Sequence, residues 1–243
     1  MKKLLLGLIM SFGFLLTHAQ NEKNIVVDDN AEVRSVGLFT GIEVSGSIDL
    51  YLSQGSSQGV AISASSDDIK QRIKTEVKNG ILQIYVDGKG LNWKNWGNNR
   101  MKAYVTFISL SKIEASGACN VKVTESIKSP ELKIEMSGAS DFSGSVNVEK
   151  LRIEASGASN IKISGTTQNV SINASGACSI RAYELNSEIC QADASGASNI
   201  KITVNKELNA NASGGSDILF KGSGLIRNIS SGGGASVKRS NND

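Results

Sequence analysis

Histidine is almost missing from this sequence of 243 residues. The single histidine, His18, lies in an N-terminal segment that we expect to be removed after export. The mature chain would then have no imidazole for a Ser-His-Asp or Cys-His nucleophile system, and none to ligate a metal ion. The cysteines are not spaced in the pairs of a zinc site, and no glycine-rich phosphate loop precedes a helix. We therefore expect no cofactor and no enzyme of these classes.

Proline and aromatic residues are also scarce. Proline occurs once and aromatic residues make up 5% of the chain, whereas there are 25 glycines. Such a chain must build its core from small and β-branched side chains, which suits many short strands joined by glycine turns. The charges are mixed and sum to only +3 at pH 7. This balance gives no reason to expect nucleic acid as a partner.

The N-terminal residues have the pattern of a signal peptide. Lys2 and Lys3 form a positive start, and the apolar run 4–16 that follows is too short to span a bilayer. Ala19 completes an acceptable cleavage site, so we assign residues 1–19 to the signal peptide and residues 20–35 to a linker. No second apolar run appears. We therefore expect an exported protein without membrane insertion after cleavage, located in the periplasm, at the cell surface or outside the cell.

The second half of the chain repeats one motif. Self-similarity with a period of about 20 residues is typical of a solenoid. Within one copy, apolar residues alternate with polar ones on both sides of a turn at 165–169, which predicts two half-buried strands. The copies begin at Ser-Gly pairs, namely at Ser116, Ser137, Ser156, Ser175, Ser195, Ser213 and Ser231.

The repeats predict the fold. No helical pattern of useful length separates the copies, so strands of successive copies must stack in parallel. We expect an all-β fold, a right-handed parallel β-helix with about 20 residues per coil. Regular coils are assigned to residues 111–235, a polar tail to 236–243, and an irregular β segment that starts the solenoid to 36–110. Within that segment, Asn79-Gly80 predicts a two-residue hairpin turn.

The Ser-Gly-Ala corner has a structural explanation. It must turn tightly while the next coil stacks about 4.8 Å away, so glycine supplies positive φ and small neighbours keep the corner narrow. A short polar side chain after each corner can hydrogen-bond the backbone and its equivalent one coil away. This predicted corner column consists of Asn120, Asp141, Asn160, Asn199 and Asp217, with Ser179 in the same slot.

The cysteines fit the same alignment. Cys119 and Cys178 take the slot that other copies give to serine, and Cys190 falls where Val170 falls. Both slots of the repeat predict that the cysteines are small buried residues. An odd number of cysteines in an exported protein also allows an intermolecular disulfide or a reactive thiol.

Outward-facing charges form columns as well. One column contains Glu114, Glu135 and Glu154, beside a column of Lys112, Lys133 and Arg152, whose opposite charges offset the repulsion within each column. A different strand carries a basic row of Lys122, Lys162, Arg181 and Lys201. This row either attracts an acidic polysaccharide or forms a solvated face. The glutamates form a ladder rather than the opposed carboxylate pair of a glycosidase.

A polar loop, residues 90–100, contains both tryptophans of the chain. Indole rings stack on sugar rings, and amide and ammonium groups can bond sugar hydroxyls. The alternative is that both indoles fold back onto the hairpin or the end of the solenoid. The candidate sugar-binding residues are Trp93, Trp96, Asn92, Lys94 and Asn95.

Three features together resemble one known family. They are "GLFTGIEVSGSIDLYLSQG" (37–55), the hairpin "VKNGILQIYV" (77–86) and the run of "SGASNI"-type corners. These features are similar to the family described as a putative auto-transporter adhesin, head GIN domain, over residues 36–235. The resemblance implies an exported β-helical protein of the Bacteroidetes group with an adhesin-like role. It brings no catalytic or binding residues with it.

Three functions remain open at this point. The first is an exported, non-enzymatic solenoid that binds a glycan or a protein of the cell envelope. The second is a structural envelope protein whose edges or flat faces contact other proteins. The third is a carbohydrate-active β-helix enzyme, for which the short, even coils leave little room for the walls of a substrate groove.

Overall fold

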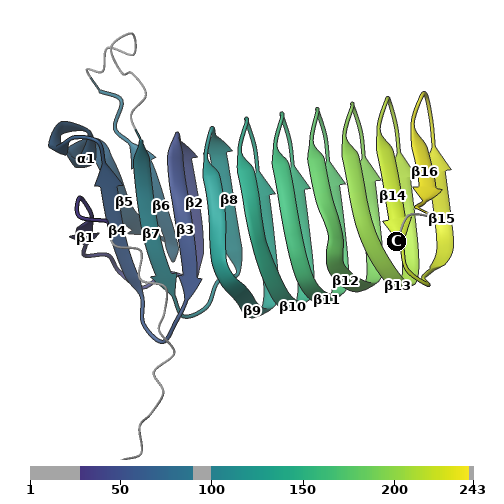
Figure 1. Cartoon of the computed structure of the whole chain (residues 1–243), viewed down its shortest axis with the longest axis horizontal. Helices are drawn as coiled ribbons and strands as arrows, with labels where there is room; N and C mark the ends of the chain where they lie inside the picture. Colours follow the sequence, from purple (N-terminus) through teal and green to yellow (C-terminus); the bar gives the residue numbers. More distant parts are fainter. Residues whose placement is uncertain (1–27, 90–99, 241–243) are drawn as a thin grey trace, which may run out of the picture.

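The protein is a β-solenoid, described here by a computed structural model over residues 28–89 and 100–240. It has about seven turns with coils of roughly 19 residues. One short helix, α1 (Asp67–Arg72), lies at the N-terminal end of the stack (Figure 1). The predicted all-β solenoid is thus confirmed. Among the described residues, no helix is long and apolar enough to cross a membrane.

Long strands form the regular coils. Each pairs in parallel with the next and bends near its middle, so it contributes to both sides of a coil (Figure 1). We call the stretch after a Ser-Gly corner the post-corner side and the stretch before the next corner the pre-corner side. The strands are β9 (Asn120–Met136), β10 (Asp141–Ala155), β11 (Asn160–Ala174), β12 (Ser179–Ala194) and β13 (Asn199–Ala212).

Shorter strands extend both sides toward the N-terminus. On the post-corner side, the order leading to β9 is β1 (Glu32–Arg34), β4 (Gly59–Ala64), β7 (Met101–Phe107) and β3 (Ile48–Gln54). On the pre-corner side, the order is β5 (Ile73–Lys78), β6 (Ile81–Val86), β2 (Gly41–Gly46) and β8 (Lys112–Gly117).

This N-terminal part is irregular because three of its pairings, β1–β4, β4–β7 and β5–β6, are antiparallel. Asn79 and Gly80 both have positive φ and form the predicted hairpin turn. Ser66 accepts a hydrogen bond from the N–H of Ile69 and thereby caps α1. The segment predicted as a linker, residues 20–35, contains β1, which pairs with β4.

Stacked glycines determine the corner. Gly157 has a φ of +74°, and a Cβ added to it would lie 2.5 Å from the carbonyl oxygen of Gly138 in the neighbouring coil. The N–H of Ala158 donates to that same oxygen at 2.8 Å. A glycine is therefore required both by its backbone conformation and by the close approach of the next coil. The same approach recurs at Gly117, Gly138, Gly176, Gly196 and Gly214.

Alternate side chains point into the solenoid and form one continuous core. Ile134, Ile153 and Ile172 stack in register on successive coils and are fully buried. Cys190 occupies the core column between Val170 and Leu208, and all three described cysteines are buried and free. Burial raises the pKa of the Cys190 thiol to about 12. The cysteines are thus small core residues, as the repeat predicts.

The C-terminal end consists of β14 (Asp217–Lys221), β15 (Leu225–Ser231) and β16 (Ser236–Arg239). β16 pairs in parallel with β14, so the assignment of residues 236–243 to a polar tail is corrected for its first residues. The reason is that Val237 lies over Ile218 and packs against the core, although the segment is polar in composition. Every residue of β15 is exposed.

Candidate functional site

The described surface offers three rows of polar side chains that run along the solenoid axis. They are the corner column and a basic row on the post-corner side, and an acidic row on the pre-corner side. The predicted sugar-binding residues, Asn92, Trp93, Lys94, Asn95 and Trp96, lie outside the described residues, so that site stays a prediction.

The corner column is continuous. The structure brings the five predicted residues and Ser179 into register and adds one aspartate and one serine. The order is Asp49, Asn120, Asp141, Asn160, Ser179, Asn199, Asp217 and Ser236. Asn120 Nδ2 donates to Asp49 Oδ1 at 2.7 Å, and Asn160 Nδ2 donates to Asp141 Oδ1 at 2.9 Å. No two carboxylates are neighbours, so each is bonded by a donor instead of facing a like charge.

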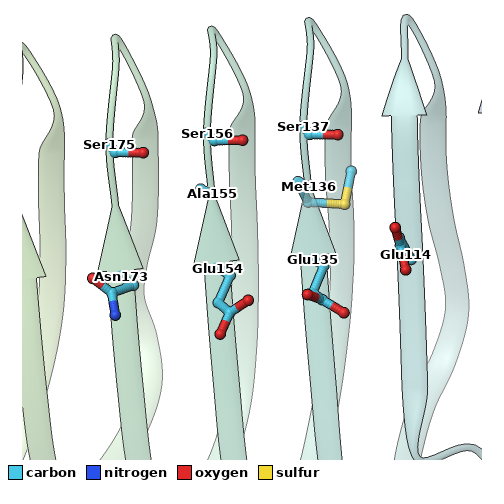
Figure 2. Close-up of a pocket in the computed structure, with 9 residues that line it drawn as sticks. All are labelled: Glu114, Glu135, Met136, Ser137, Glu154, Ala155, Ser156, Asn173 and Ser175. Carbon is cyan, nitrogen blue, oxygen red and sulfur yellow. The ribbon is translucent and has the colours of Figure 1, made fainter.

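The acidic row lies across adjacent strands of the pre-corner side. Figure 2 shows the carboxylates of Glu114, Glu135 and Glu154 in line, with Asn173 continuing the row. A row of serine hydroxyls, Ser137, Ser156 and Ser175, runs parallel to it nearer the corner (Figure 2). The register extends the acidic row to Glu43, Gln83 and Glu76 in one direction and to Asp193 and Asn211 in the other.

Three open depressions follow this row. They enclose about 270 Å³ beside Glu43, about 340 Å³ beside Glu135 (Figure 2) and about 460 Å³ beside Asp193. Each is bounded by acidic or amide side chains of the row and by serines of the corner. The depressions therefore lie one after another along the pre-corner side, and they present carboxylate, amide and hydroxyl groups to the outside.

Ion pairs connect the acidic row across the coils. Each basic side chain of the adjacent column contacts the carboxylate two residues ahead on its own strand, and two of the three also contact the carboxylate of the next coil. The distances are 2.6 Å for Lys112–Glu114, 2.8 Å for Lys112–Glu135, 2.8 Å for Lys133–Glu135, 3.1 Å for Lys133–Glu154 and 2.6 Å for Arg152–Glu154.

These contacts decide the protonation of Glu135. Partial burial opposes its ionisation, but hydrogen bonds from Lys112 and Lys133 outweigh burial and lower the pKa of Glu135 to about 2. A general acid for glycoside cleavage needs a raised pKa so that it carries a proton at neutral pH. Glu135 carries none there. Glu135 therefore acts as an acceptor within ion pairs and is poorly suited to be a general acid.

The basic row comprises Lys122, Lys162, Arg181, Lys201 and Lys238, which the register aligns on the post-corner side. Two members of the row are not basic: Ser143 lies between Lys122 and Lys162, and Leu219 lies between Lys201 and Lys238. Toward the N-terminus the same row continues with Tyr51 and Tyr104, whose rings stack with centroids 5.2 Å apart. Lys122 Nζ lies 5.8 Å from the centre of the Tyr51 ring.

Sequence reasoning missed one half-buried polar cluster at the N-terminal end. The Tyr104 hydroxyl donates to Asp28 at 2.7 Å, and Lys102 Nζ lies 3.3 Å from the same carboxylate oxygen. The hydrogen bond from Tyr104 is the main reason why the pKa of Asp28 is lowered, while burial and Asp28 together raise the pKa of Tyr104. Asp28 precedes the first strand, so no repeat spacing predicts this contact.

Comparison with known proteins agrees with this architecture. Residues 38–224 match the family described as "Putative auto-transporter adhesin, head GIN domain". The protein belongs to this family. The match spans the irregular N-terminal coils and most of the regular ones, and it ends just before β15. No curated protein matches the chain.

Solved structures share the fold. A crystal structure of a putative adhesin from Bacteroides fragilis superposes with a TM-score of 0.80 at 23% identity, covering 86% of this chain and 96% of that one. A putative lipid binding protein from Parabacteroides distasonis gives 0.66 at 20% identity, with 88% and 98% covered. A putative adhesin from Parabacteroides merdae gives 0.64 at 18% identity, with 86% and 95% covered.

Proposed function

We propose that the protein is an exported, non-enzymatic binding module that attaches to a glycan or a protein of a cell surface. The observation that supports this most directly is the repetition of the same outward polar groups once per coil, in rows along the axis. Adjacent coils are spaced by about 4.8 Å, the distance between hydrogen-bonded strands. Such rows suit an extended ligand, which can contact several coils at once and sum many weak contacts.

Membership in an adhesin family supports the same proposal. The predicted signal peptide agrees with a place of action outside the cytoplasm. The chemistry of the acidic row argues against an enzyme, because Glu114, Glu135 and Glu154 are neutralised by basic neighbours. They also lie on the same side of successive coils, whereas a glycosidase holds its two carboxyl groups on opposite sides of one bond.

A structural envelope protein is the second candidate, and β15 favours it. All its residues are exposed, and it is the last strand of the pre-corner side among the described residues. Its outer edge can therefore accept a strand from another protein. In that case the protein would act through its end rather than through its rows.

The two candidates are separated by a glycan array probed with the predicted mature chain, residues 20–243, together with photo-cross-linking to isolated cell envelopes. A related group of sugars on the array, or one envelope protein cross-linked through the coil surfaces, supports the binding module. Cross-links confined to β15 support the structural role. New reducing ends or unsaturated products from any polysaccharide would contradict a non-enzymatic function.

The predicted tryptophan site is tested in the same assay. The double variant Trp93→Ala with Trp96→Ala should lose glycan binding while the melting temperature stays nearly constant, if the indoles stack on sugar rings. A large loss of stability would assign both indoles to packing.

A further inference from the structure

The five cations of the basic row have no acidic partner among residues 28–89 and 100–240. Within the described part of the chain, the ion pairs with an N–O distance of at most 4.0 Å involve other basic residues. None includes Lys122, Lys162, Arg181, Lys201 or Lys238. Three of them, Lys162, Arg181 and Lys201, lie on successive coils. The pre-corner side differs, because each cation beside the acidic row there contacts one or two carboxylates.

Like charges on adjacent strands repel each other, and the repulsion is strongest between side chains directly opposite in a sheet. Two outward columns flank the row on the same strands. One is the corner column, whose aspartates are bonded by Asn120, Asn160 and Ser236 rather than by the row. The other contains Ser145 and Ser164. The row is also uninterrupted by acidic residues. It therefore forms a narrow positive strip that an anionic chain lying along the axis would neutralise.

The surroundings of the row favour a sugar polymer. A depression of about 470 Å³ opens beside Lys162, and it is lined by hydroxyl groups of Thr124, Ser126, Ser145 and Ser164 together with Glu125 and Glu184. Hydroxyl and carboxylate groups are suitable partners for sugar hydroxyls. Beyond Lys122, the stacked rings of Tyr51 and Tyr104 supply an aromatic surface at the end of the strip.

We propose that the basic row binds an anionic polysaccharide, one that carries carboxylate or sulfate groups along its length. The polymer lies along the solenoid axis, with its acidic groups against Lys162, Arg181 and Lys201 and its hydroxyls toward the depression. This inference rests on the proposed binding function and names the class of its ligand. Arg181 adds planar donors that can bind two oxygens of one acidic group at once.

Other polyanions fit the strip less well. Nucleic-acid-binding proteins present a broad basic surface, often with separate aromatic platforms for the bases. Here the strip is one residue wide beside a column that contains Asp49, Asp141 and Asp217. The net charge of the chain is only +3. A membrane surface would require a wider basic face as well.

The experiment compares two triple variants of the mature chain with the same change in net charge. The first, Lys162→Gln with Arg181→Gln and Lys201→Gln, neutralises the centre of the row. The control, Lys128→Gln with Lys150→Gln and Lys206→Gln, removes three exposed cations away from it. Affinities are measured by biolayer interferometry for polygalacturonate, dextran sulfate, neutral dextran, single-stranded oligo(dT) and anionic phosphatidylserine vesicles, and circular dichroism checks that both variants are folded.

The wild type is expected to bind polygalacturonate or dextran sulfate but not dextran, and more weakly as salt is added. The row variant should lose at least about tenfold in affinity, which corresponds to about 1.4 kcal/mol spread over three contacts, and the control should stay within about twofold. Equal losses in both variants would overturn the proposal, since binding would then follow net charge alone. Tighter row-dependent binding of oligo(dT) or vesicles would also overturn it.

The proposed function is tested separately from this inference. If the array or the envelope cross-linking detects a ligand that the row variant still binds, and neither anionic polysaccharide binds the wild type, the inference fails while the binding module stands. If no ligand is detected in any of these assays, both fail.

Discussion

Replacing Gly157 by alanine tests the physical basis of the solenoid corner. Alanine at a φ of +74° adopts a left-handed conformation that costs about 1–2 kcal/mol. Its Cβ would also lie 2.5 Å from the carbonyl oxygen of Gly138, so the two coils must move apart. This movement weakens the hydrogen bonds that the N–H groups of Ser156 and Ala158 donate to the preceding coil, each with a net value of about 1 kcal/mol.

The sum is an expected destabilisation of about 3–4 kcal/mol. Urea unfolding followed by circular dichroism measures it. Hydrogen exchange of β10 and β11 shows whether the loss is local, because solenoid coils depend mainly on their neighbours. Gly215→Ala is the matched control. Gly215 has no positive φ, and its added Cβ meets its nearest atom at 3.7 Å.

The control also restores the alanine that most other corners contain. It should therefore be neutral, or stabilising by about 0.4–1 kcal/mol through the reduced freedom of the unfolded chain. The reasoning would be refuted if Gly157→Ala unfolded within about 1 kcal/mol of Gly215→Ala, because neither the backbone conformation nor the close approach would then constrain the corner.

Three further predictions concern burial, charge and the open end. Cys190, whose pKa is raised to about 12 by burial, should resist a thiol reagent at pH 8 until the protein unfolds, so modification and unfolding rates should agree. Asp28→Asn should cost about 1–3 kcal/mol at pH 7. Because folding lowers the pKa of Asp28, this difference should persist above its unfolded value and vanish as the pH falls through the folded value, which melting curves from pH 2 to 7 would show. Amides of β15 should exchange faster than those of β11, as mass spectrometry can measure.

The regular coils could be predicted from the sequence because they depend on two local signals. The spacing of the Ser-Gly pairs gives the length of each coil, and the alternation of apolar residues gives the side that faces inward. In-register stacking then places equivalent residues in columns, so the pairing of Glu135 with Glu154 and of Lys162 with Arg181 follows by alignment.

The N-terminal part could be predicted only as irregular, because its neighbours in space are not neighbours in sequence. β7 lies between β4 and β3, and β2 lies between β6 and β8. Neither order has a repeat that would reveal it. The stacking of Tyr51 on Tyr104 and the contact of Asp28 with Tyr104 both depend on these crossings, so the sequence alone does not predict them.

The polar composition of residues 236–243 predicts a tail, whereas the structure forms β16 there. The segment 236–243 is polar, and only Val237 carries the alternation of a strand. A single apolar residue is a weak signal in a sequence, but in the solenoid it is enough, since β14 supplies the backbone partners of β16. The same reasoning applies to Glu32–Arg34, which pairs with β4 although its side chains are largely exposed.

In-register stacking also imposes a condition on every charged column, and the three rows meet it differently. Two like charges about 5 Å apart repel by roughly 1 kcal/mol in water, so a column of them is costly unless it is offset. The acidic row is offset by its ion pairs, and the corner column alternates aspartate with amide or hydroxyl donors. The basic row has neither arrangement at Lys162, Arg181 and Lys201. Among the described residues, these three cations form no ion pair within the fold, and an anionic ligand would account for their place on successive coils.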